Sequence, residues 1–374
     1  MESTRAIGPG ALRWTVFCRV VDNFGDVGVC WRLAAQLGAR GDRVRLVIDD
    51  ASALAWMAPA GAAGVEVSGW HDAAFDVDDP DDVVVEAFGC DPPPAFVAVM
   101  RTAARVPVWI NLEYLSAEAY VERSHGLSSP QLSGPGAGLT KWFFYPGFTA
   151  RTGGLLREDG LLAARAAFDV RDRAAWLAAQ GIVCQPGERV VTLFCYDNPA
   201  CAEMIAALGR AAPRTLLLLT PGPAQRQVTT APPGVRLHAL PWLPQPAFDR
   251  LLWSSDLAFV RGEDSLVRAL WSGAPFVWQA YPQHDGAHHA KVEALLARLA
   301  LPPEVAALWR AWNGMASWPA GVAGAALDAD ALATDAPDAP DAPWAHSVRR
   351  LRDDVASRPD LAAALRAFAL DHVT

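Results

Sequence analysis

The stretch that decides the fold is residues 257–275, LAFVRGEDSLVRALWSGAP. Its first four residues are apolar and predict a short buried strand. The apolar spacing from Leu266 to Trp271 predicts a helix that ends at Gly273, just before Pro275. A strand that passes through a tight turn into a helix places backbone N–H groups and the positive end of the helix dipole at the turn. The stretch therefore predicts an α/β unit with a candidate phosphate site at the carboxyl end of the strand.

The polar residues of this turn allow two interpretations. Arg261 and Arg268 flank it, and with Ser265 they add hydrogen-bond donors for an anion. Glu263 and Asp264 count against a bare phosphate, because a carboxylate in the same place repels it. The alternative is that Asp264 or Ser265 only caps the helix. This stretch alone leaves both open.

Length, charge and cysteine content limit the classes of protein to which this chain can belong. A chain of 374 residues exceeds one typical core and predicts two domains, and a net charge of −9 argues against nucleic acid or an anionic membrane as main partner. No apolar run approaches about 18 residues and no signal-peptide pattern opens the chain, so a cytoplasmic protein is expected. Six cysteines without C-x-x-C spacing fit buried thiols better than disulfides or a structural zinc site.

The first half of the chain alternates strands and helices. Apolar runs predict strands at 14–21, 43–48, 83–87 and 106–111, with helices at 29–39 and 96–104 and a loop at 124–138. Such alternation is typical of a parallel sheet covered on both faces. The first turn, Asp-Asn-Phe-Gly-Asp-Val-Gly at 22–28, lacks G-x-G-x-x-G, so a nicotinamide site is not expected.

A second series of alternating strands and helices begins between residues 160 and 185, where we expect the domain boundary. Strands are predicted at 189–195, 216–220, 235–237, 257–260 and 276–279, helices at 173–179 and 200–208, and a loop at 221–234. The Asp-Ala-Pro repeat at 335–343 predicts an exposed or disordered loop, whose role within 320–345 the sequence leaves open. Two closing helices, 347–356 and 361–370, could pack on either domain.

The two polar turns both follow strands, where ligands bind in open α/β sheets. Asp22 and Asp26 stand four residues apart, a pair that suits a cationic acceptor, with one carboxylate as general base. The alternative is an N-cap and a dipole-favoured acid at the start of the following helix. If the domains face each other, the two turns line one cleft, so the pattern indicates a cleft enzyme.

Aromatic residues near the strand ends of the second half could bind a nucleobase. Phe194, Tyr196 and Trp242 can stack on a base and Gln245 can read its edge; the alternative is that they are core residues.

Three histidines invite a metal interpretation. His284 and His288 are four apart, so they would share a helix face, and Asp285 and His289 lie beside them. No third ligand follows this pair at a recognisable spacing and His-Glu-x-x-His is absent, which favours solvated or phosphate-facing histidines over zinc.

A set of ordered motifs carries a family resemblance. They are DNFGDVGV at 22–29 with WRL at 31–33, NLEYLS at 111–116, GGLLRE at 153–158, WLPQ at 242–245, RGEDS at 261–265, and PFVW at 275–278 with YPQ at 281–283. Together they resemble the protein-arginine rhamnosyltransferases that modify translation elongation factor P (the EarP family). The resemblance runs from about residue 14 to residue 300 and is weak in the last seventy residues.

The resemblance implies a GT-B glycosyltransferase fold, with two Rossmann-like domains facing across a cleft. Residues 12–165 would bind the acceptor, with a C-terminal helix, 359–374, able to pack back on them, and residues 182–345 would bind the nucleotide sugar. The implied reaction moves L-rhamnose from dTDP-β-L-rhamnose, with inversion and without metal or cofactor, to an arginine in the N-terminal domain of elongation factor P. This activates the factor for rescue of ribosomes stalled at polyproline. The alternatives are a GT-B transferase with another acceptor and a non-catalytic nucleotide-sugar-binding regulator.

The resemblance also assigns residues. It implies that Asp26 is the general base, Asp22 its essential neighbour and Glu263 a further catalytic residue. It places the donor against Asn23, Phe24, Gly25, Phe194, Tyr196, Trp242, Gln245, Arg261, Glu263, Asp264, Ser265 and Tyr281. Trp242 stands where the family is expected to have phenylalanine, which keeps an aromatic face at the base.

Overall fold

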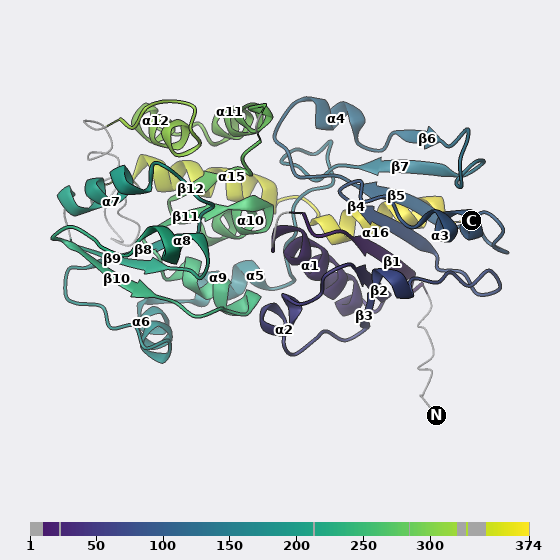
Figure 1. Ribbon diagram of the computed structural model, residues 1–374, viewed down its shortest axis with the longest axis horizontal. Coiled ribbons are helices and arrows are strands. Elements are labelled where there is room, and N and C mark those ends of the chain that lie inside the picture. Colours follow the sequence, from purple (N-terminus) through teal and green to yellow (C-terminus); the bar gives the residue numbers. More distant parts are fainter. Residues whose placement is uncertain are drawn as a thin grey trace. The chain divides into compact units, whose positions relative to one another are not determined.

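The computed structural model describes residues 10–21, 24–211, 214–283, 285–319, 327 and 342–373. The chain divides into two compact units, Met1–Glu158 with Arg358–Thr374 (unit 1) and Asp159–Ser357 (unit 2) (Figure 1). The predictions for Asp22, Asn23, His284 and most of the Asp-Ala-Pro repeat lie outside the described residues. Among the residues described, no helix is long and apolar enough to cross a membrane.

Unit 1 is built on a seven-stranded sheet in the order β3-β2-β1-β4-β5-β7-β6. Its strands are β1 (Arg13–Cys18), β2 (Arg43–Ile48), β3 (Val65–Gly69), β4 (Val83–Ala87), β5 (Val108–Leu112), β6 (Ser128–Pro130) and β7 (Thr140–Phe144). Every pair is parallel except β6 with β7 at the edge. The parallel sheet and the four strands predicted for this half are confirmed, with shifted ends.

Helices cover both faces of this sheet because successive residues of each strand point to opposite sides. Val16 belongs to the apolar cluster formed with α1 (Gly25–Ala39) and α16 (Leu361–His372), whereas Phe17 belongs to the cluster of α3 (Pro94–Met100). The short helices are α2 (Leu54–Met57), η1 (Trp70–Asp72) and α4 (Tyr120–Ser124). The last helix of the chain thus completes the core of unit 1.

The start of α16 is fixed to unit 1 by polar contacts. The Asp360 carboxylate caps the helix by accepting from the backbone amide of Ala363 at 3.0 Å, and it pairs with Arg40 at 2.8 Å. The amide of Leu361 donates to the carbonyl of Leu155 at 2.9 Å. A cap that also pairs with a neighbouring element fixes both the helix end and its docking.

Unit 2 holds a five-stranded, wholly parallel sheet in the order β10-β9-β8-β11-β12. The strands are β8 (Arg189–Leu193), β9 (Thr215–Leu219), β10 (Val235–Ala239), β11 (Leu257–Arg261) and β12 (Phe276–Gln279). The helices are α5 (Leu161–Ala167), α6 (Val170–Ala179), α7 (Cys201–Arg210), α8 (Pro223–Gln227), α9 (Gln245–Trp253), α10 (Gly262–Ser272), α11 (Ala287–Leu299), α12 (Pro303–Trp312) and α15 (Pro343–Ala356). All five predicted strands are confirmed.

Both faces of this second sheet are packed. One carries a cluster in which Trp176 of α6 and Leu251 of α9 meet Val190 and Leu216 of the sheet. On the strands β11 and β12, the rings of Phe259 and Phe276 lie 4.8 and 5.4 Å from those of Trp312 and Trp309 in α12. Large apolar side chains on both sides explain why the strands read as continuous apolar runs.

The structure corrects several expectations. The predicted loop at 221–234 contains α8, the predicted loop at 124–138 contains β6, and the helix expected at 29–39 begins at Gly25. The helices α9, α11 and α12 were not predicted. Three of the helices concerned, α8, α9 and α12, begin with proline in their first two positions, where the missing N–H costs nothing, so a residue taken as a loop signal marks a helix start.

Candidate functional site

The candidate donor residues of unit 2 gather at one edge of its sheet. Phe194 follows β8, Arg261 ends β11, and Tyr281 comes shortly after β12. Because β8, β11 and β12 are parallel neighbours, their carboxyl ends share that edge.

Arg261 is the centre of this group. Arg261 is 4% exposed, and its guanidinium carbon lies 4.5 Å from the ring centroids of both Phe194 and Tyr196. The Tyr196 ring in turn meets Tyr281 edge-on at 5.4 Å, and the Tyr196 amide donates to Oε1 of Gln279 at 2.9 Å. Aromatic faces stabilise a guanidinium more strongly where water is excluded. The arrangement therefore fixes a positive charge at the carboxyl edge of the sheet.

The first turn of α10 begins at the same point. Gly262, the first helical residue, has a φ of 67°, which glycine adopts at little cost, and its carbonyl accepts from the Trp278 indole at 2.8 Å. The Ser265 hydroxyl accepts from the Arg261 amide at 3.1 Å and donates to the Arg261 carbonyl. The amides of a first turn have no acceptor within their helix, so this end attracts negative charge.

The two acids of this turn lie on α10 itself. Glu263 pairs with Lys291 of α11, with 3.8 Å between Oε1 and Nζ. Glu263 and Asp264 are the acidic residues of the first turn, where the helix dipole favours a carboxylate. The prediction that Asp264 or Ser265 serves as the N-cap is wrong: the N-cap is Arg261, which makes no side-chain cap hydrogen bond.

The segment between β10 and α9 brings two further candidates. Gln245 is buried and opens α9, and one turn later the Phe248 ring meets that of Phe194 at 5.4 Å. Residues three apart share a helix face, so the start of α9 lies beside the aromatic group around Arg261. Trp242 is 42% exposed, and the alternative that it is a core residue is therefore wrong.

In unit 1, Asp26 lies in the first turn of α1 and is 3% exposed. Its Oδ2 accepts from the backbone amide of Val21 at 2.8 Å, which holds the segment leaving β1 against the helix. Phe24 is the N-cap of α1, makes no side-chain cap hydrogen bond, and packs its ring on Trp56 at 5.3 Å. Asp26 is thus a first-turn carboxylate at the carboxyl end of β1.

Neighbouring strands add polar and aromatic groups at that edge. Nδ2 of Asn111 donates to Oε1 of Glu113 at 2.8 Å, and its Oδ1 accepts from the Gly89 amide at 3.0 Å. Phe88 has a φ of 60°, rare outside glycine, and stacks on Tyr114 with ring centroids 4.4 Å apart. The strands β1, β4 and β5 are adjacent, so Glu113 follows a strand only two places from the one that precedes Asp26.

A buried ion pair lies in the same sheet. Glu86, on β4, accepts from Nζ of Lys141 at 2.6 Å and from the Trp109 indole at 3.1 Å. Burial raises the pKa of the Glu86 carboxyl, against the opposing effect of Lys141. Both partners lie within strands, which makes this pair part of the core and of the support for the edge.

The comparisons with known proteins agree on one family. The sequence model described as Elongation-Factor P (EF-P) rhamnosyltransferase EarP matches residues 14–370. The chain belongs to the EarP family. A protein-arginine rhamnosyltransferase of Pseudomonas putida is 44% identical over 80% of this chain and 86% of its own. Another, from Pseudomonas aeruginosa, is 40% identical over 96% and 99%.

A solved structure agrees as well. The structure concerned with EarP-mediated arginine glycosylation of translation elongation factor EF-P is 30% identical, covers 96% of this chain and 99% of its own, and has a TM-score of 0.65. Two other solved glycosyltransferases, 16% and 14% identical, share the fold with TM-scores of 0.51. The GT-B fold, with a parallel α/β sheet in each unit, is confirmed.

The predicted site residues of this EarP chain fall into two groups. In unit 2 the structure brings together Phe194, Tyr196, Arg261, Ser265 and Tyr281, with Glu263 and Asp264 on the same turn and Gln245 at the start of α9. In unit 1 it places Phe24, Gly25 and Asp26 at the start of α1.

Arg268 does not belong to this group, and its predicted role as an anion donor is wrong. Its guanidinium is buried and donates to both carboxylate oxygens of Asp249 in α9, at 2.8 and 2.7 Å. Residues 261 and 268 lie two helical turns apart, so the second arginine sits well down the helix from the turn. It joins two helices of unit 2.

Sequence reasoning gave no role to Glu113, to the stacked pair of Phe88 and Tyr114, or to Lys291. For the first three the signal was present, because polar and aromatic residues directly follow the buried strands β4 and β5. Lys291 carries no such signal, since only the packing of α11 near the start of α10 brings it to Glu263.

His288 serves local structure. Nδ1 of His288 accepts from the Gln283 amide at 3.2 Å, and its ring lies 4.3 Å from that of His289. Burial lowers the pKa of His288, which favours its neutral form. Within the described ranges, which omit His284, no group of three His, Cys, Asp or Glu side chains could hold a metal ion.

Proposed function

We propose that this EarP protein transfers L-rhamnose from dTDP-β-L-rhamnose to an arginine in the N-terminal domain of elongation factor P. The family match over residues 14–370 supports the reaction class. The related solved structure concerns arginine glycosylation of elongation factor P by an EarP protein, which supports the acceptor. The donor and the residue roles rest on the chemistry of the two candidate sites.

The observation that carries the proposal is the position of Arg261. It ends β11 at the N-terminus of α10, and its guanidinium carbon lies 4.5 Å from the centroids of two aromatic rings. Departure of a nucleoside diphosphate places negative charge on the leaving oxygen. A fixed guanidinium and the amides of a helix N-terminus stabilise that charge without reorganising. In this proposal they do what a metal ion does in other transferases, and the enzyme needs neither metal nor cofactor.

The aromatic residues suit the base of the donor. Trp242 is exposed enough to stack on thymine, and Gln245 at the start of α9 has an amide that can pair with the edge of the base. Tyr281, 46% exposed, is available to the sugar or the diphosphate. Glu263 and Asp264 then face hydroxyl groups, which donate to carboxylates, while the helix amides take the phosphates.

The acceptor chemistry explains the acids of unit 1. A guanidinium keeps its proton at neutral pH, because its pKa lies far above 7, and it is a poor nucleophile while protonated. Carboxylates hold its planar fork through charge-assisted hydrogen bonds. Asp26 takes the proton as the guanidinium nitrogen bonds to the anomeric carbon and the bond from that carbon to the diphosphate oxygen breaks. Attack opposite the leaving group inverts the anomeric configuration. Asp22 is proposed as the second carboxylate.

The cellular setting follows from the acceptor. Because an elongation factor works at ribosomes, we place the reaction in the cytoplasm. The modified factor is proposed to rescue ribosomes stalled at polyproline. Neither nucleic acid nor a membrane is proposed as a partner.

The test is incubation of the enzyme with dTDP-β-L-rhamnose and purified elongation factor P, followed by intact-protein mass spectrometry. A single deoxyhexose increment on the factor, absent when its acceptor arginine is replaced by lysine, is expected. Consumption of donor with an unmodified factor would indicate another acceptor. Donor binding without turnover would indicate a non-catalytic regulator.

A further inference from the structure

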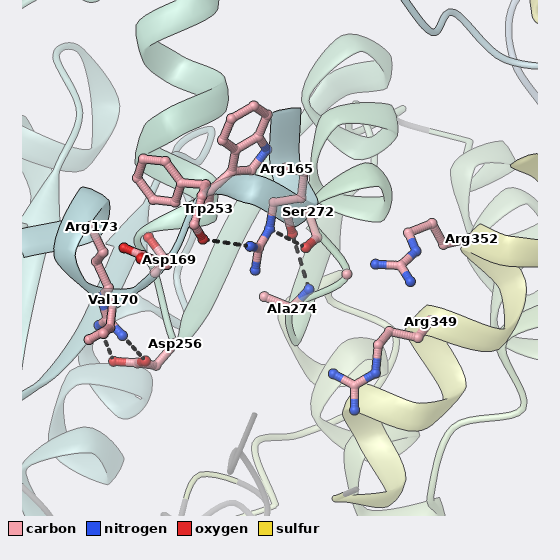
Figure 2. Close-up of a pocket in the computed structure, with 13 residues that line it drawn as sticks. Arg165, Asp169, Val170, Arg173, Trp253, Asp256, Ser272, Ala274, Arg349 and Arg352 are labelled. Atoms are coloured by element: carbon pink, nitrogen blue, oxygen red, sulfur yellow. Dashed lines mark hydrogen bonds and ion pairs between the residues drawn. The ribbon is translucent and has the colours of Figure 1, made fainter. Parts of the chain in front are cut away.

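Unit 2 contains a cavity at the opposite end of its sheet from Arg261. Its volume is about 440 Å³, within the range of small-molecule sites. Ser255 is one of its lining residues. Asp256, directly before β11, and Ala274, shortly before β12, also line it (Figure 2). The five residues of β11 separate this cavity from Arg261 by about 16 Å at ~3.3 Å per residue. It is therefore distinct from the candidate donor site.

The charged lining is mostly basic. Four arginines and two aspartates line the cavity: Arg165, Arg173, Arg349, Arg352, Asp169 and Asp256.

Both carboxylates are engaged within the fold. Asp256 accepts from both terminal nitrogens of Arg173 at 2.9 and 2.8 Å, and from the Val190 amide at 2.7 Å. Asp169 caps α6, accepting from the amides of Arg171 and Asp172 at 2.7 and 2.9 Å. Arg173 and backbone N–H groups thus compensate the negative charge of these two carboxylates.

The other arginines come from two elements. Arg165, from α5, donates to the carbonyls of Ser272 and Phe168 at 2.9 and 3.5 Å. Arg349 and Arg352 extend from α15 toward the end of α10 near Ala274 (Figure 2). Arg352 also pairs through Nε with Oδ1 of Asp353, the next residue of α15, at 2.8 Å. Residues three apart on a helix share a face, so α15 presents both guanidinium groups together.

The end of α10 is shaped to admit one of these groups. Gly273 has a φ of 72°, the left-handed conformation that ends a helix, and the Arg349 side chain passes 3.5 Å from the position of a Cβ there. A Cβ at this position would overlap the Arg352 guanidinium. Glycine therefore both ends the helix and leaves room for a cation beside it.

Helix ends explain part of this arrangement. α9 and α10 both end at the cavity, and cations stabilise the negative end of a helix dipole. That accounts for Arg165, which donates to the last carbonyl of α10. It does not account for a cavity of this volume beside four guanidinium groups, since capping a helix end needs no empty space.

We propose that this cavity is a second ligand site, which binds a small phosphorylated molecule. Guanidinium groups bind phosphate oxygens in a directed way, and Arg165, Arg349 and Arg352 approach from two sides. The remaining volume holds the body of the ligand against the aromatic wall of Trp253 and Phe168, whose rings lie 5.6 Å apart. The site is separate from the reaction and does not depend on the donor proposed above.

Inorganic pyrophosphate is the probe. Isothermal titration calorimetry is run once with saturating dTDP, which occupies the proposed donor site, and once without dTDP. Wild-type protein is expected to bind pyrophosphate in both series, and Arg349→Gln or Arg352→Gln to weaken binding at least fivefold. Arg350→Gln is the matched control, because Arg350 is on the same helix but does not line the cavity; it is expected to stay within twofold.

Two results would overturn the proposal: no binding to the dTDP-saturated wild type, or equal weakening by all three variants. If dTDP itself fails to bind, the comparison of variants without dTDP still decides this site, so failure of the donor proposal is recognised separately. Thermal unfolding checks that each variant is folded. Should one unfold, crystals of the wild type soaked in tungstate decide: anomalous density between Arg165 and Arg352 supports the site, and density only elsewhere contradicts it.

Discussion

The guanidinium carbon of Arg261 lies 4.5 Å from the ring centroid of Tyr196, and this contact ties the charge at the start of α10 to the neighbouring strand. Tyr196 is in turn held by Gln279, so the arginine is positioned by two strands besides its own. An anion that binds at this helix start meets a cation whose place is already fixed.

Replacement of Tyr196 tests this relationship. Tyr196→Leu removes the aromatic face and is expected to weaken dTDP binding by roughly 1–2 kcal/mol, or about 5- to 30-fold, as measured by calorimetry. Tyr196→Phe keeps the face and should bind within about threefold of the wild type, because only the hydroxyl is lost. Equal losses of dTDP affinity in the two variants would show that the tyrosine hydroxyl, and not the contact of the ring with Arg261, supports dTDP binding.

Ser265→Ala removes the hydroxyl that bonds the amide and carbonyl of Arg261. We expect dTDP affinity to fall by about 0.5–1.5 kcal/mol, or roughly 2- to 12-fold. Ser254→Ala is the control, because that buried hydroxyl makes no hydrogen bond within the described residues. An unchanged dTDP titration for Ser265→Ala would remove this serine from the donor site.

The pair of Arg268 and Asp249 should stabilise unit 2 without touching the donor. Arg268→Met leaves a buried carboxylate without its bidentate partner and is expected to cost about 3–5 kcal/mol in the free energy of unfolding. The double variant Arg268→Met with Asp249→Leu should recover most of that loss, since no buried charge remains. Denaturant unfolding measures both; a double variant as unstable as the single one would refute the interpretation.

His125 gives unit 1 a dependence on pH. Burial lowers its pKa, while its Nδ1 accepts from the Tyr145 amide at 3.0 Å. A lowered pKa in the folded state means that the unfolded chain takes up the proton first. The contribution of neutral His125 to the free energy of unfolding is therefore complete above the histidine pKa of the unfolded chain, about 6.5. It is lost as the pH falls from that value toward the lower pKa of the folded state. Hydrogen exchange gives the protection factors of the β7 amides at pH 7.5 and pH 5.5. The difference between the two pH values should be smaller in His125→Asn than in the wild type.

The fold was largely predictable because strands buried on both faces are visible as apolar runs. The turn at Arg261 is an example: a strand, a tight turn and a helix closed by Gly273 were predicted from residue types, whereas the left-handed conformation of Gly262 is seen only in the structure. Three helices that begin with proline, α8, α9 and α12, were missed, since proline at a helix start and proline in a loop look alike in a sequence.

The site was predictable only in part. Sequence could say that Arg261 and Arg268 flank a turn, but not that α9 supplies Asp249 to neutralise the second of them. The cavity lined by Arg165 and Arg352 shows the same limit. Its residues lie almost two hundred positions apart, and only the packing of α15 beside α10 brings them together.

We propose that Asp26 takes the proton in sugar transfer, while the site around Arg261 binds the donor. The measurement is transfer to elongation factor P by Asp26→Asn, with its dTDP affinity determined on the same preparation. Asn keeps the size of the side chain and can still accept from the Val21 amide, but it cannot act as a base. Asp50→Asn, an exposed carboxylate after β2, is the control. For Asp26→Asn we expect a loss of transfer of roughly 10²–10⁴-fold, with dTDP affinity within about threefold of the wild type. Transfer at near the wild-type rate would contradict it.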